Sequence, residues 1–256
     1  MDSKVTTAVI LAAGLGTRLK HHTEAQPKGF LEVDGTSLIE RSITNLIHAG
    51  INDIIIGTGY RYEHFDKLKQ KYPVTTFTNL DYRITGSMYT LYVLRHLISK
   101  PFLLLESDLL YDPIALKYLL DDNEQDVILA SGATRSGDEV FIQASGESNL
   151  QQMSKDRNVL THISGELVGI TKLSPLTVEK MAAFSESHFR NGNRMLNYED
   201  ALVGVTAQQP IRVKVVEGLI WCEIDDEHHL NRALTQIYPK IKASKGGAIN
   251  DANNNE

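Results

Sequence analysis

The 256-residue chain contains a single cysteine, Cys222, and therefore cannot form an internal disulfide. A lone cysteine fits a reducing compartment. Because no partner for it is evident, we expect Cys222 to be a small buried apolar residue rather than a nucleophile. The apolar run at residues 5–10 is too short for export or for crossing a membrane. These absences predict a cytoplasmic protein.

Blocks of basic residues are also missing. Lysine and arginine number 26 against 32 aspartates and glutamates, which gives a formal net charge of −6. Surfaces that bind nucleic acid are usually strongly basic, so we expect no nucleic-acid partner, and no membrane partner either. Hydrophobic residues make up 42% of the chain, enough at this length for the core of one large α/β domain, with or without an insertion.

The first eighty residues alternate between apolar strand patterns and amphipathic helix patterns. Buried strands are expected at 5–12, 53–57 and 74–78, where apolar residues run without polar alternation. Helices are expected after Ser37, a predicted N-cap with Glu40 three residues on, and over 61–72. Strand, helix, strand, helix, strand in this order predicts a parallel sheet with right-handed crossovers.

Farther along, the sequence predicts two more buried strands, 101–105 and 126–130, and a helix capped by Ser87. From residue 131 short strands alternate with Gly, Ser, Asn and Asp, which predicts antiparallel β structure added to one end of the sheet. The other expected elements are strands at 139–143, 159–163, 166–171, 211–216 and 219–224, a short helix after Pro113, and helices at 175–189, 197–207 and 226–241. Residues 244–256 are polar and low in complexity, and we expect a disordered tail or linker.

The first strand leads into Gly14-Leu15-Gly16, which is followed by Arg18 and, ten residues later, by Lys28. A glycine-rich turn after a buried strand can bring backbone N–H groups against a phosphate chain, and the two cations can add positive charge. A dinucleotide fingerprint would need a glycine where Leu19 stands, and no Walker A motif is present. On spacing alone the loop is equally compatible with a tight turn.

Single carboxylates and histidine pairs carry weaker signals. Asp108 follows the most apolar predicted strand, at the end of a parallel sheet where ligands bind, but by spacing alone it could be a turn residue or a helix cap. Asp226 is expected to be an N-cap. The histidine pairs at 21–22 and 228–229 are expected at the surface or in caps, because adjacent side chains diverge and cannot chelate one ion together.

The string LAAGLGTRL followed by QPKGFLEVDGTSLIERSI resembles the signature of the sugar-nucleotidyltransferase superfamily. The matching positions are Leu11, Ala12, Ala13, Gly14, Gly16, Thr17, Arg18, Leu19, Pro27, Lys28 and Gly35. Gly29 departs from the many members with alanine or a larger residue there. The resemblance implies an enzyme that couples a nucleoside triphosphate to a phosphorylated small molecule and releases pyrophosphate. It also implies a three-layer α/β/α Rossmann-like nucleotidyltransferase fold over residues 1–243, with a mostly parallel central sheet and a small β-rich acceptor-binding insertion at about 131–172 and 190–207.

The same resemblance assigns roles to individual residues. Asp108 matches the family's magnesium aspartate and Asp225 its second metal ligand, and two acids with phosphate oxygens and waters suit Mg²⁺. Arg18 would hold the β/γ-phosphates, and Lys28 the α-phosphate or the acceptor anion, so these two and the two acids are the expected catalytic residues. The expected nucleotide-binding residues are Leu11, Ala12, Ala13, Gly14, Gly16, Thr17, Arg18, Lys28, Asn79, Gly86 and Ser87. By spacing alone, Asn79 is also compatible with a turn and Ser87 with a helix cap.

Within the superfamily, the chain is most similar to the small cytidylyltransferases that use CTP to activate phosphocholine or 2-aminoethylphosphonate, over roughly residues 6–234. The markers are Phe77-Thr78-Asn79, residues 85–91 and the ESD at 106–108. An aromatic cage binds a quaternary ammonium, whereas a primary ammonium has three donors and prefers carboxylates or carbonyls. Where phosphocholine enzymes tend to carry tryptophan, this chain has Val140 and Glu199. The difference favours 2-aminoethylphosphonate.

The expected acceptor-binding residues are Glu139, Lys155, Tyr198, Glu199 and Asp200. The acids among them could instead be merely solvated. Phosphocholine and sugar 1-phosphates remain alternative acceptors, and a non-catalytic nucleotide-binding subunit is the alternative outside the enzymes. A homodimer is left open.

Overall fold

The computed structural model describes residues 4–19 and 21–244. The predicted tail at 244–256 lies outside these residues except for Ser244. Among the described residues, no helix has the length and apolar character needed to cross a membrane.

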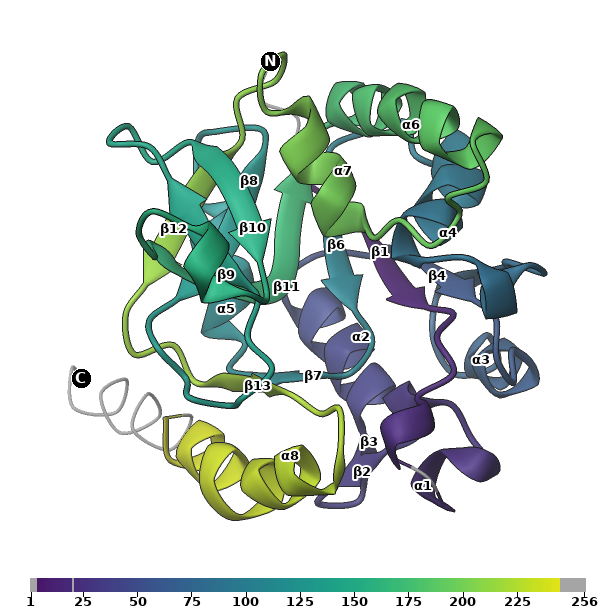
Figure 1. The fold of residues 1–256 in the computed structure, drawn as a ribbon. Helices are drawn as coiled ribbons and strands as arrows, with labels where there is room; N and C mark the ends of the chain where they lie inside the picture. Colours follow the sequence, from purple (N-terminus) through teal and green to yellow (C-terminus); the bar gives the residue numbers. More distant parts are fainter. Residues whose placement is uncertain (1–3, 20, 245–256) are drawn as a thin grey trace.

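A nine-stranded sheet forms the centre of the molecule (Figure 1). Its main path runs β10-β9-β11-β6-β1-β4-β5, with β8 paired to β11 and β12 paired to β8. The strands are β1 (Thr7–Ala12), β4 (Asp53–Thr58), β5 (Val74–Thr78), β6 (Phe102–Glu106), β8 (Val127–Ser131), β9 (Phe141–Ala144), β10 (Leu150–Ser154), β11 (Gly165–Leu173) and β12 (Arg212–Val216). β1 pairs in parallel with β4 and β6, and β4 with β5, whereas β11 runs antiparallel to β6, β8 and β9. The predicted parallel sheet with antiparallel strands added at one end is confirmed.

Two short strand pairs complete the β structure. β2 (Glu32–Val33) pairs with β3 (Thr36–Ser37), and β7 (Leu109–Tyr111) pairs with β13 (Trp221–Glu223). The α-helices are α1 (His21–Glu24), α2 (Leu38–His48), α3 (Glu63–Leu68), α4 (Ser87–Leu94), α5 (Ile114–Leu120), α6 (Pro175–Arg190), α7 (Tyr198–Val205) and α8 (Glu227–Arg232). α8 continues through a π-helical turn, Ala233–Ile237, into helix that runs to residue 244. Short 3₁₀ turns lie at Thr17–Leu19, Lys28–Phe30, Tyr82–Ile84, Arg95–Leu97 and Arg157–Val159.

Helices cover both faces of the sheet because successive side chains of a buried strand point to opposite faces. From β1, Val9 and Leu11 belong to a core shared with α4, α6 and α7, which gather on one side of the sheet (Figure 1). Ala8 and Ile10 belong to a second core, shared with α2, α3 and α5. The three-layer arrangement expected from the sequence is therefore confirmed. A third, smaller core packs the last helix against β7 and β13.

Several local predictions are confirmed. Ser37 accepts a hydrogen bond from the backbone N–H of Glu40 at 3.3 Å and caps α2, and Asp226 caps α8. Cys222 is a free, buried cysteine, as expected. The predicted strand at 74–78 coincides with β5.

Other local predictions are wrong. Ser87 is the first residue of α4 rather than its cap, and Gly86 occupies the cap position. The predicted strand at 159–163 does not form, because Val159 and Ile163 are apolar but exposed. β10 was missed because a register shift between Leu150 and Gln152 breaks its alternation. By contrast, the two strands predicted at 211–216 and 219–224 do form, as β12 and β13, and they pair with β8 and β7 respectively.

Candidate active site

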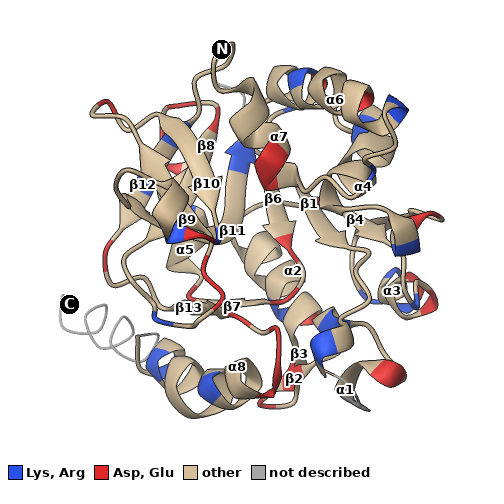
Figure 2. Cartoon of the chain, in the orientation of Figure 1, with Lys and Arg blue, Asp and Glu red and all other residues tan. Residues whose placement is uncertain are grey.

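A cavity of about 520 Å³ opens at the carboxyl end of β1 and β6. Its walls come from the glycine loop after β1, the end of β6, the start of α7, the loop at 134–140, and the segment between β13 and α8. Acidic residues lie at the end of β6, at the start of α7 and between β13 and α8 (Figure 2). In an open parallel sheet, ligands bind outside the carboxyl ends of the strands, so this cavity is the candidate active site.

The glycine loop has a fixed shape. Gly16 adopts φ +63°, and a Cβ at this position would lie 3.3 Å from side-chain atoms of both Lys28 and Thr23. The Thr23 hydroxyl donates to the Gly16 carbonyl at 2.9 Å, and the Tyr60 hydroxyl donates to the Thr23 carbonyl at 3.0 Å. Glycine is therefore needed at position 16 for both its backbone angle and its close neighbours. The loop residues that line the cavity include those predicted from the sequence: Leu11, Ala12, Ala13, Gly14, Gly16, Thr17 and Arg18.

Lys28 lies among carboxylates, with its side chain only 11% exposed. Its Nζ is 2.5 Å from Asp108 Oδ2 and 3.7 Å from Glu223 Oε1, and it also pairs with Asp225 Oδ1. Burial alone would lower the pKa of Lys28, but the charges of these acids outweigh that effect and raise the pKa above its usual value. Lys28 is therefore a permanently charged counter-ion at the centre of the site.

The acids around Lys28 come from two strand ends with the same pattern, Glu-x-Asp. Glu106 is the last residue of β6 and Glu223 the last residue of β13, and Asp108 and Asp225 lie two residues after these strand ends. Burial raises the pKa of Glu106 to about 8 and that of Glu223 to about 10, and the negative charge of Asp108 adds to both shifts. Sequence reasoning selected only the two aspartates. The repeated Glu-x-Asp pattern at 106–108 and 223–225 is the signal that could have found the glutamates.

The acid cluster fits a divalent metal ion. Glu106, Asp108 and Glu223 each offer a carboxylate oxygen within 4.8 Å of the others. Asp108 Oδ1 and Asp225 Oδ2 are buried, and neither accepts a hydrogen bond from any of the described residues, 4–19 and 21–244. Buried carboxylate oxygens without partners are costly, and a cation ligand would satisfy them. The two predicted metal ligands thus lie together, both in contact with Lys28.

Arg18 connects the glycine loop to the opposite wall of the cavity. Its guanidinium is 2.6 Å from Asp138 Oδ2 and 2.8 Å from Asp225 Oδ1, and Lys155 Nζ is 2.7 Å from Asp138 Oδ1. Burial would raise the pKa of Asp138, but its contacts with Lys155 and Arg18 hold that pKa well below the usual range. Asp138 was not among the predicted site residues, because nothing in its local sequence indicates that two distant cations share it.

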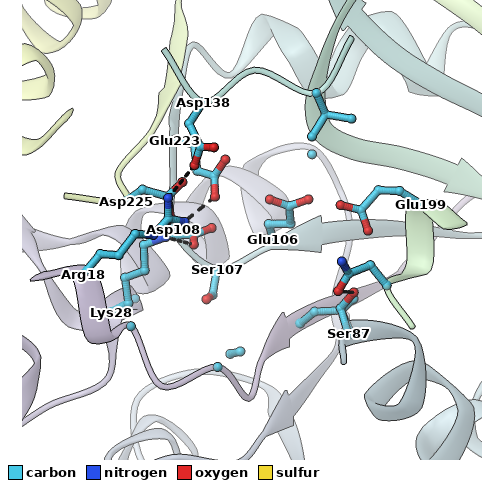
Figure 3. Close-up of a pocket in the computed structure, with 18 of the residues that line it drawn as sticks. Arg18, Lys28, Ser87, Glu106, Ser107, Asp108, Asp138, Glu199, Glu223 and Asp225 are labelled. Carbon is cyan, nitrogen blue, oxygen red and sulfur yellow. Dashed lines mark hydrogen bonds and ion pairs between the residues drawn. The ribbon is translucent and has the colours of Figure 1, made fainter. Parts of the chain in front are cut away.

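Glu106 also faces Glu199, on the other side of Ser107 from the two cations Arg18 and Lys28 (Figure 3). Figure 3 shows Arg18, Lys28, Asp108, Asp138, Glu223 and Asp225 on one side of Ser107, and Glu106 and Glu199 on the other. The Tyr198 hydroxyl donates to Glu106 Oε1 at 2.6 Å, and the Tyr198 backbone N–H donates to Ser87 Oγ at 2.9 Å. Gly169, at φ +79°, leaves room for Glu106, since a Cβ there would lie 3.0 Å from its carboxyl carbon. The site therefore has two distinct ends.

Glu199 has one buried carboxylate oxygen, Oε2, without a hydrogen-bond partner among the described residues. Burial raises the pKa of Glu199 to about 7, and the neighbouring charge of Asp200 contributes to the shift. In Figure 3 its carboxylate points from α7 toward Glu106.

Two predicted site residues lie outside the cavity lining. The Asn79 amide donates to the hydroxyls of Thr85 and Thr90, each at 3.0 Å, so Asn79 fixes the loop before α4. Asp200 accepts from the backbone N–H of Asn197 at 2.9 Å and completes the capping box of α7. The other predicted nucleotide and acceptor residues, Gly86, Ser87, Glu139, Lys155, Tyr198 and Glu199, line the cavity.

Trp221 and His229 line the cavity although sequence reasoning left them out of the site. Trp221 is the single tryptophan of the chain, and one tryptophan does not make an aromatic cage. His229 is only 4% exposed, so the expectation of a surface position fails for it. Both are brought to the cavity by packing of the C-terminal segment against β7 and the third core, which no local pattern reveals.

Comparison with known proteins places this chain among nucleotidyltransferases. Residues 8–168 match the MobA-like NTP transferase domain. The chain is 30% identical over 219 residues to the choline-phosphate cytidylyltransferase of Streptococcus pneumoniae, covering 85% of this chain and 92% of that one. It is 37% identical over 92 residues to the 2-aminoethylphosphonate cytidylyltransferase of Lancefieldella rimae, 36% of this chain and 37% of that one. The inositol-1-phosphate CTP transferase of T. maritima has the same fold, with a TM-score of 0.80 at 19% identity over 94% of this chain and 98% of that one.

Proposed function

This chain belongs to the MobA-like NTP transferase family and is a nucleotidyltransferase with cytidylyltransferase relatives, and from that premise we propose that it transfers CMP from CTP to 2-aminoethylphosphonate, releasing pyrophosphate. The observation that carries the choice of acceptor is the buried Oε2 of Glu199, which faces Glu106 (Figure 3) and has no hydrogen-bond partner in the described part of the chain. A primary ammonium has three N–H donors and can satisfy this oxygen, whereas a trimethylammonium group has none.

The triphosphate half of the site is the glycine loop with Arg18 and Lys28. Asp108 and Asp225 would hold Mg²⁺, a cation that prefers hard oxygen ligands and keeps several waters. When bound, the metal supplies charge neutralisation and orientation at the phosphates. Arg18 and Lys155 both contact Asp138 in this structure, and phosphate or phosphonate oxygens would take the place of that carboxylate.

The chemical step needs no general base. Phosphate-type monoesters lose their second proton near pH 6, so the attacking phosphonate oxygen is anionic at neutral pH. That oxygen forms a bond to the α-phosphorus of CTP, and the bond from the α-phosphorus to the bridging oxygen of pyrophosphate breaks. The protein contributes by positioning the two anions against each other and by offsetting their charge through Arg18, Lys28 and Lys155.

Phosphocholine is the second candidate acceptor. A relative matched over 85% of this chain is a choline-phosphate cytidylyltransferase. Trp221 and Tyr198 line the same cavity, and aromatic faces attract quaternary ammonium groups. Because these aromatic residues line the same cavity as Glu106 and Glu199, the comparison of the two acceptors is the decisive experiment.

The test is a matrix of the four nucleoside triphosphates against 2-aminoethylphosphonate, phosphocholine and a sugar 1-phosphate, with pyrophosphate release as the readout. We expect CTP and 2-aminoethylphosphonate to give the highest kcat/KM. A clear preference for phosphocholine would overturn the acceptor assignment and leave the cytidylyl transfer intact. No pyrophosphate from any pair would contradict the enzyme activity and favour a non-catalytic nucleotide-binding subunit.

Replacing the unpartnered glutamate should weaken acceptor binding selectively. In Glu199→Gln, the KM for 2-aminoethylphosphonate should rise by about 10- to 100-fold, because a hydrogen bond to a charged group is worth about 1.5–3 kcal/mol. The KM for CTP should change less, since Glu199 lies on the other side of Ser107 from Arg18 and Lys28, the proposed triphosphate ligands (Figure 3). Glu179→Gln, on the exposed surface of α6, is the matched control. A selective rise in the KM for CTP instead would contradict the proposed role.

The pH profile gives an independent check on the same residue. Because the folded-state pKa of Glu199 is raised from 4.5 to about 7, the side chain gains its charge only as the pH rises through 7. We expect the kcat/KM for 2-aminoethylphosphonate to rise over this interval in the wild type, and this part of the rise to be absent in Glu199→Gln. The raised pKa also means that Glu199 contributes stability below about pH 4.5 that is lost as the pH approaches 7. Identical pH profiles for the two proteins would count against this assignment.

A further inference from the structure

His229 lies in the first turn of α8, directly behind the candidate metal carboxylate Asp225. Its side chain is almost completely buried, at 5% exposure. The helix begins beside it, because Asp226 caps α8 by accepting from the His229 backbone N–H at 2.8 Å. The ring therefore has a fixed position relative to the end of β13, and the proposed reaction gives it no chemical role.

Both ring nitrogens of His229 have backbone partners on different segments. The Asp225 backbone N–H donates to Nδ1 at 3.3 Å, and Nε2 lies 3.1 Å from the carbonyl oxygen of Ser136. A carbonyl can only accept, so Nε2 carries the hydrogen and donates it. Nδ1 then has a free lone pair for the Asp225 N–H. One neutral tautomer satisfies both contacts.

The Ser136 contact belongs to residues 132–140, which we call the Asp138 loop. A second side chain of the last helix, Arg232, donates to the Thr134 carbonyl of this loop at 3.0 Å. Asp138 itself extends to Arg18 and Lys155 in the cavity. The last helix thus holds the Asp138 loop at two carbonyls two residues apart, one through His229 and one through Arg232.

Arg18 joins the same two segments from the cavity side. Its guanidinium contacts Asp138 at 2.6 Å and Asp225 at 2.8 Å. If a phosphate chain binds Arg18, the contacts of Arg18 with Asp138 and Asp225 are released. The two carboxylates then lose the cation that lies between them. The His229 ring hydrogen-bonds with the backbone N–H of Asp225 and the backbone carbonyl of Ser136, and not with the carboxylates that Arg18 contacts. These contacts can therefore persist when Arg18 changes partners.

We infer that His229 is a positioning residue that couples the end of β13, next to the proposed metal ligand Asp225, to the Asp138 loop. It thereby keeps Asp225 and the Asp138 loop in fixed positions relative to each other when the triphosphate binds. The metal ion and the acceptor enter this inference through the proposed function. The coupling itself is a property of the protein and can be measured without turnover.

Two substitutions separate the two contacts. In His229→Asn, the side-chain oxygen can stand where Nδ1 stands and accept from the Asp225 N–H, but it cannot reach Ser136. In His229→Gln, the amide nitrogen can stand where Nε2 stands and donate to Ser136, but the acceptor for Asp225 is lost. His228→Gln is the matched control, because His228 is the exposed neighbour on the same turn.

Three readouts apply to each variant: hydrogen exchange of the amides at 132–140, Mn²⁺ affinity in the presence of CTP, and the KM for 2-aminoethylphosphonate. We expect His229→Asn to raise loop exchange and the acceptor KM by about fivefold to tenfold with Mn²⁺ affinity nearly unchanged. We expect His229→Gln to weaken Mn²⁺ binding by a similar factor with loop exchange nearly unchanged. His228→Gln should alter none of them.

This separation of effects supports the inference. It is overturned if both variants match the His228 control, or if both change all three readouts together in proportion to a lower melting temperature, as a purely structural residue would. Absence of cytidylyl transfer in the wild type would instead count against the proposed function. The loop exchange would still decide whether His229 holds the Asp138 loop.

Discussion

Asp108→Asn is expected to lower kcat by about a thousandfold or more while the protein remains folded. The amide keeps the shape of the carboxylate but loses the charge that would hold a divalent cation beside Asp225. Asp108 Oδ1 is one of the two buried carboxylate oxygens at this end of the site that have no partner among the described residues. Turnover measured as pyrophosphate release, with Mn²⁺ binding in parallel, should show both losses.

The same substitution should have little effect on stability. The charge of Asp108 contributes to the raised pKa of Glu106 and of Glu223, so removing it relieves repulsion within the acid cluster and offsets the lost contact with Lys28. We expect the free energy of unfolding to change by about 1 kcal/mol or less. Asp112→Asn, at the far end of β7, is the control for both measurements. Turnover near the wild-type level in Asp108→Asn would refute the metal assignment.

Lys28→Met is expected to abolish turnover by a similar factor and, in contrast, to destabilise the protein. Removing the ammonium leaves Asp108, Glu223 and Asp225 close together without their shared cation. Breaking a buried ion pair by removing one partner costs about 3–5 kcal/mol. Because the acids can take up protons in response, we expect about 3 kcal/mol at pH 7, or a melting temperature lower by roughly 6–12 °C.

The pH dependence of this loss has a definite sign. The folded-state pKa of Lys28 is raised above 10.5, so its stabilisation is fully present below that pH and is lost only as the pH rises through the raised folded value. In Lys28→Met the acids around position 28 protonate readily. The loss of unfolding free energy relative to the wild type should therefore become smaller as the pH is lowered from 7 to 5. Lys69→Met, which removes a surface pair with Asp66, serves as the control and should cost about 1 kcal/mol or less. A Lys28→Met protein as stable as the wild type at pH 7 would show that Lys28 is not the counter-ion of the cluster.

The two variants together test the site more strictly than either one alone. Both should be inactive, but only Lys28→Met should be less stable, because one substitution removes a like charge from the acid cluster and the other removes its cation. Inactivity accompanied by equal loss of stability in both would indicate general unfolding instead of separate chemical roles.

Much of the fold and one half of the site could be predicted from the sequence, since their signals lie within a few residues. The β1 strand, the glycine loop and the N-cap at Ser37 depend on short spacings that fix backbone angles and burial locally. Asp108 lies two residues after β6, at the edge of the parallel sheet where the carboxyl ends of the strands lie. Predictions failed where local pattern and burial disagree, as at the exposed Val159 and Ile163, or where a bulge interrupts alternation, as in β10.

Only the tertiary structure decided which partners these groups have. Lys28 meets an acid 197 residues away, Arg18 meets Asp138 across 120 residues, and His229 contacts Ser136 across 93. Such contacts depend on how the antiparallel strands and the last helix pack against the parallel sheet, and no local spacing encodes that distance. The same packing buries Oε2 of Glu199 without a hydrogen-bond partner among the described residues, and this oxygen is the basis for the proposed acceptor. The sequence alone indicated a nucleotidyltransferase, whereas packing decided which charged groups line the cavity and which of them pair with one another.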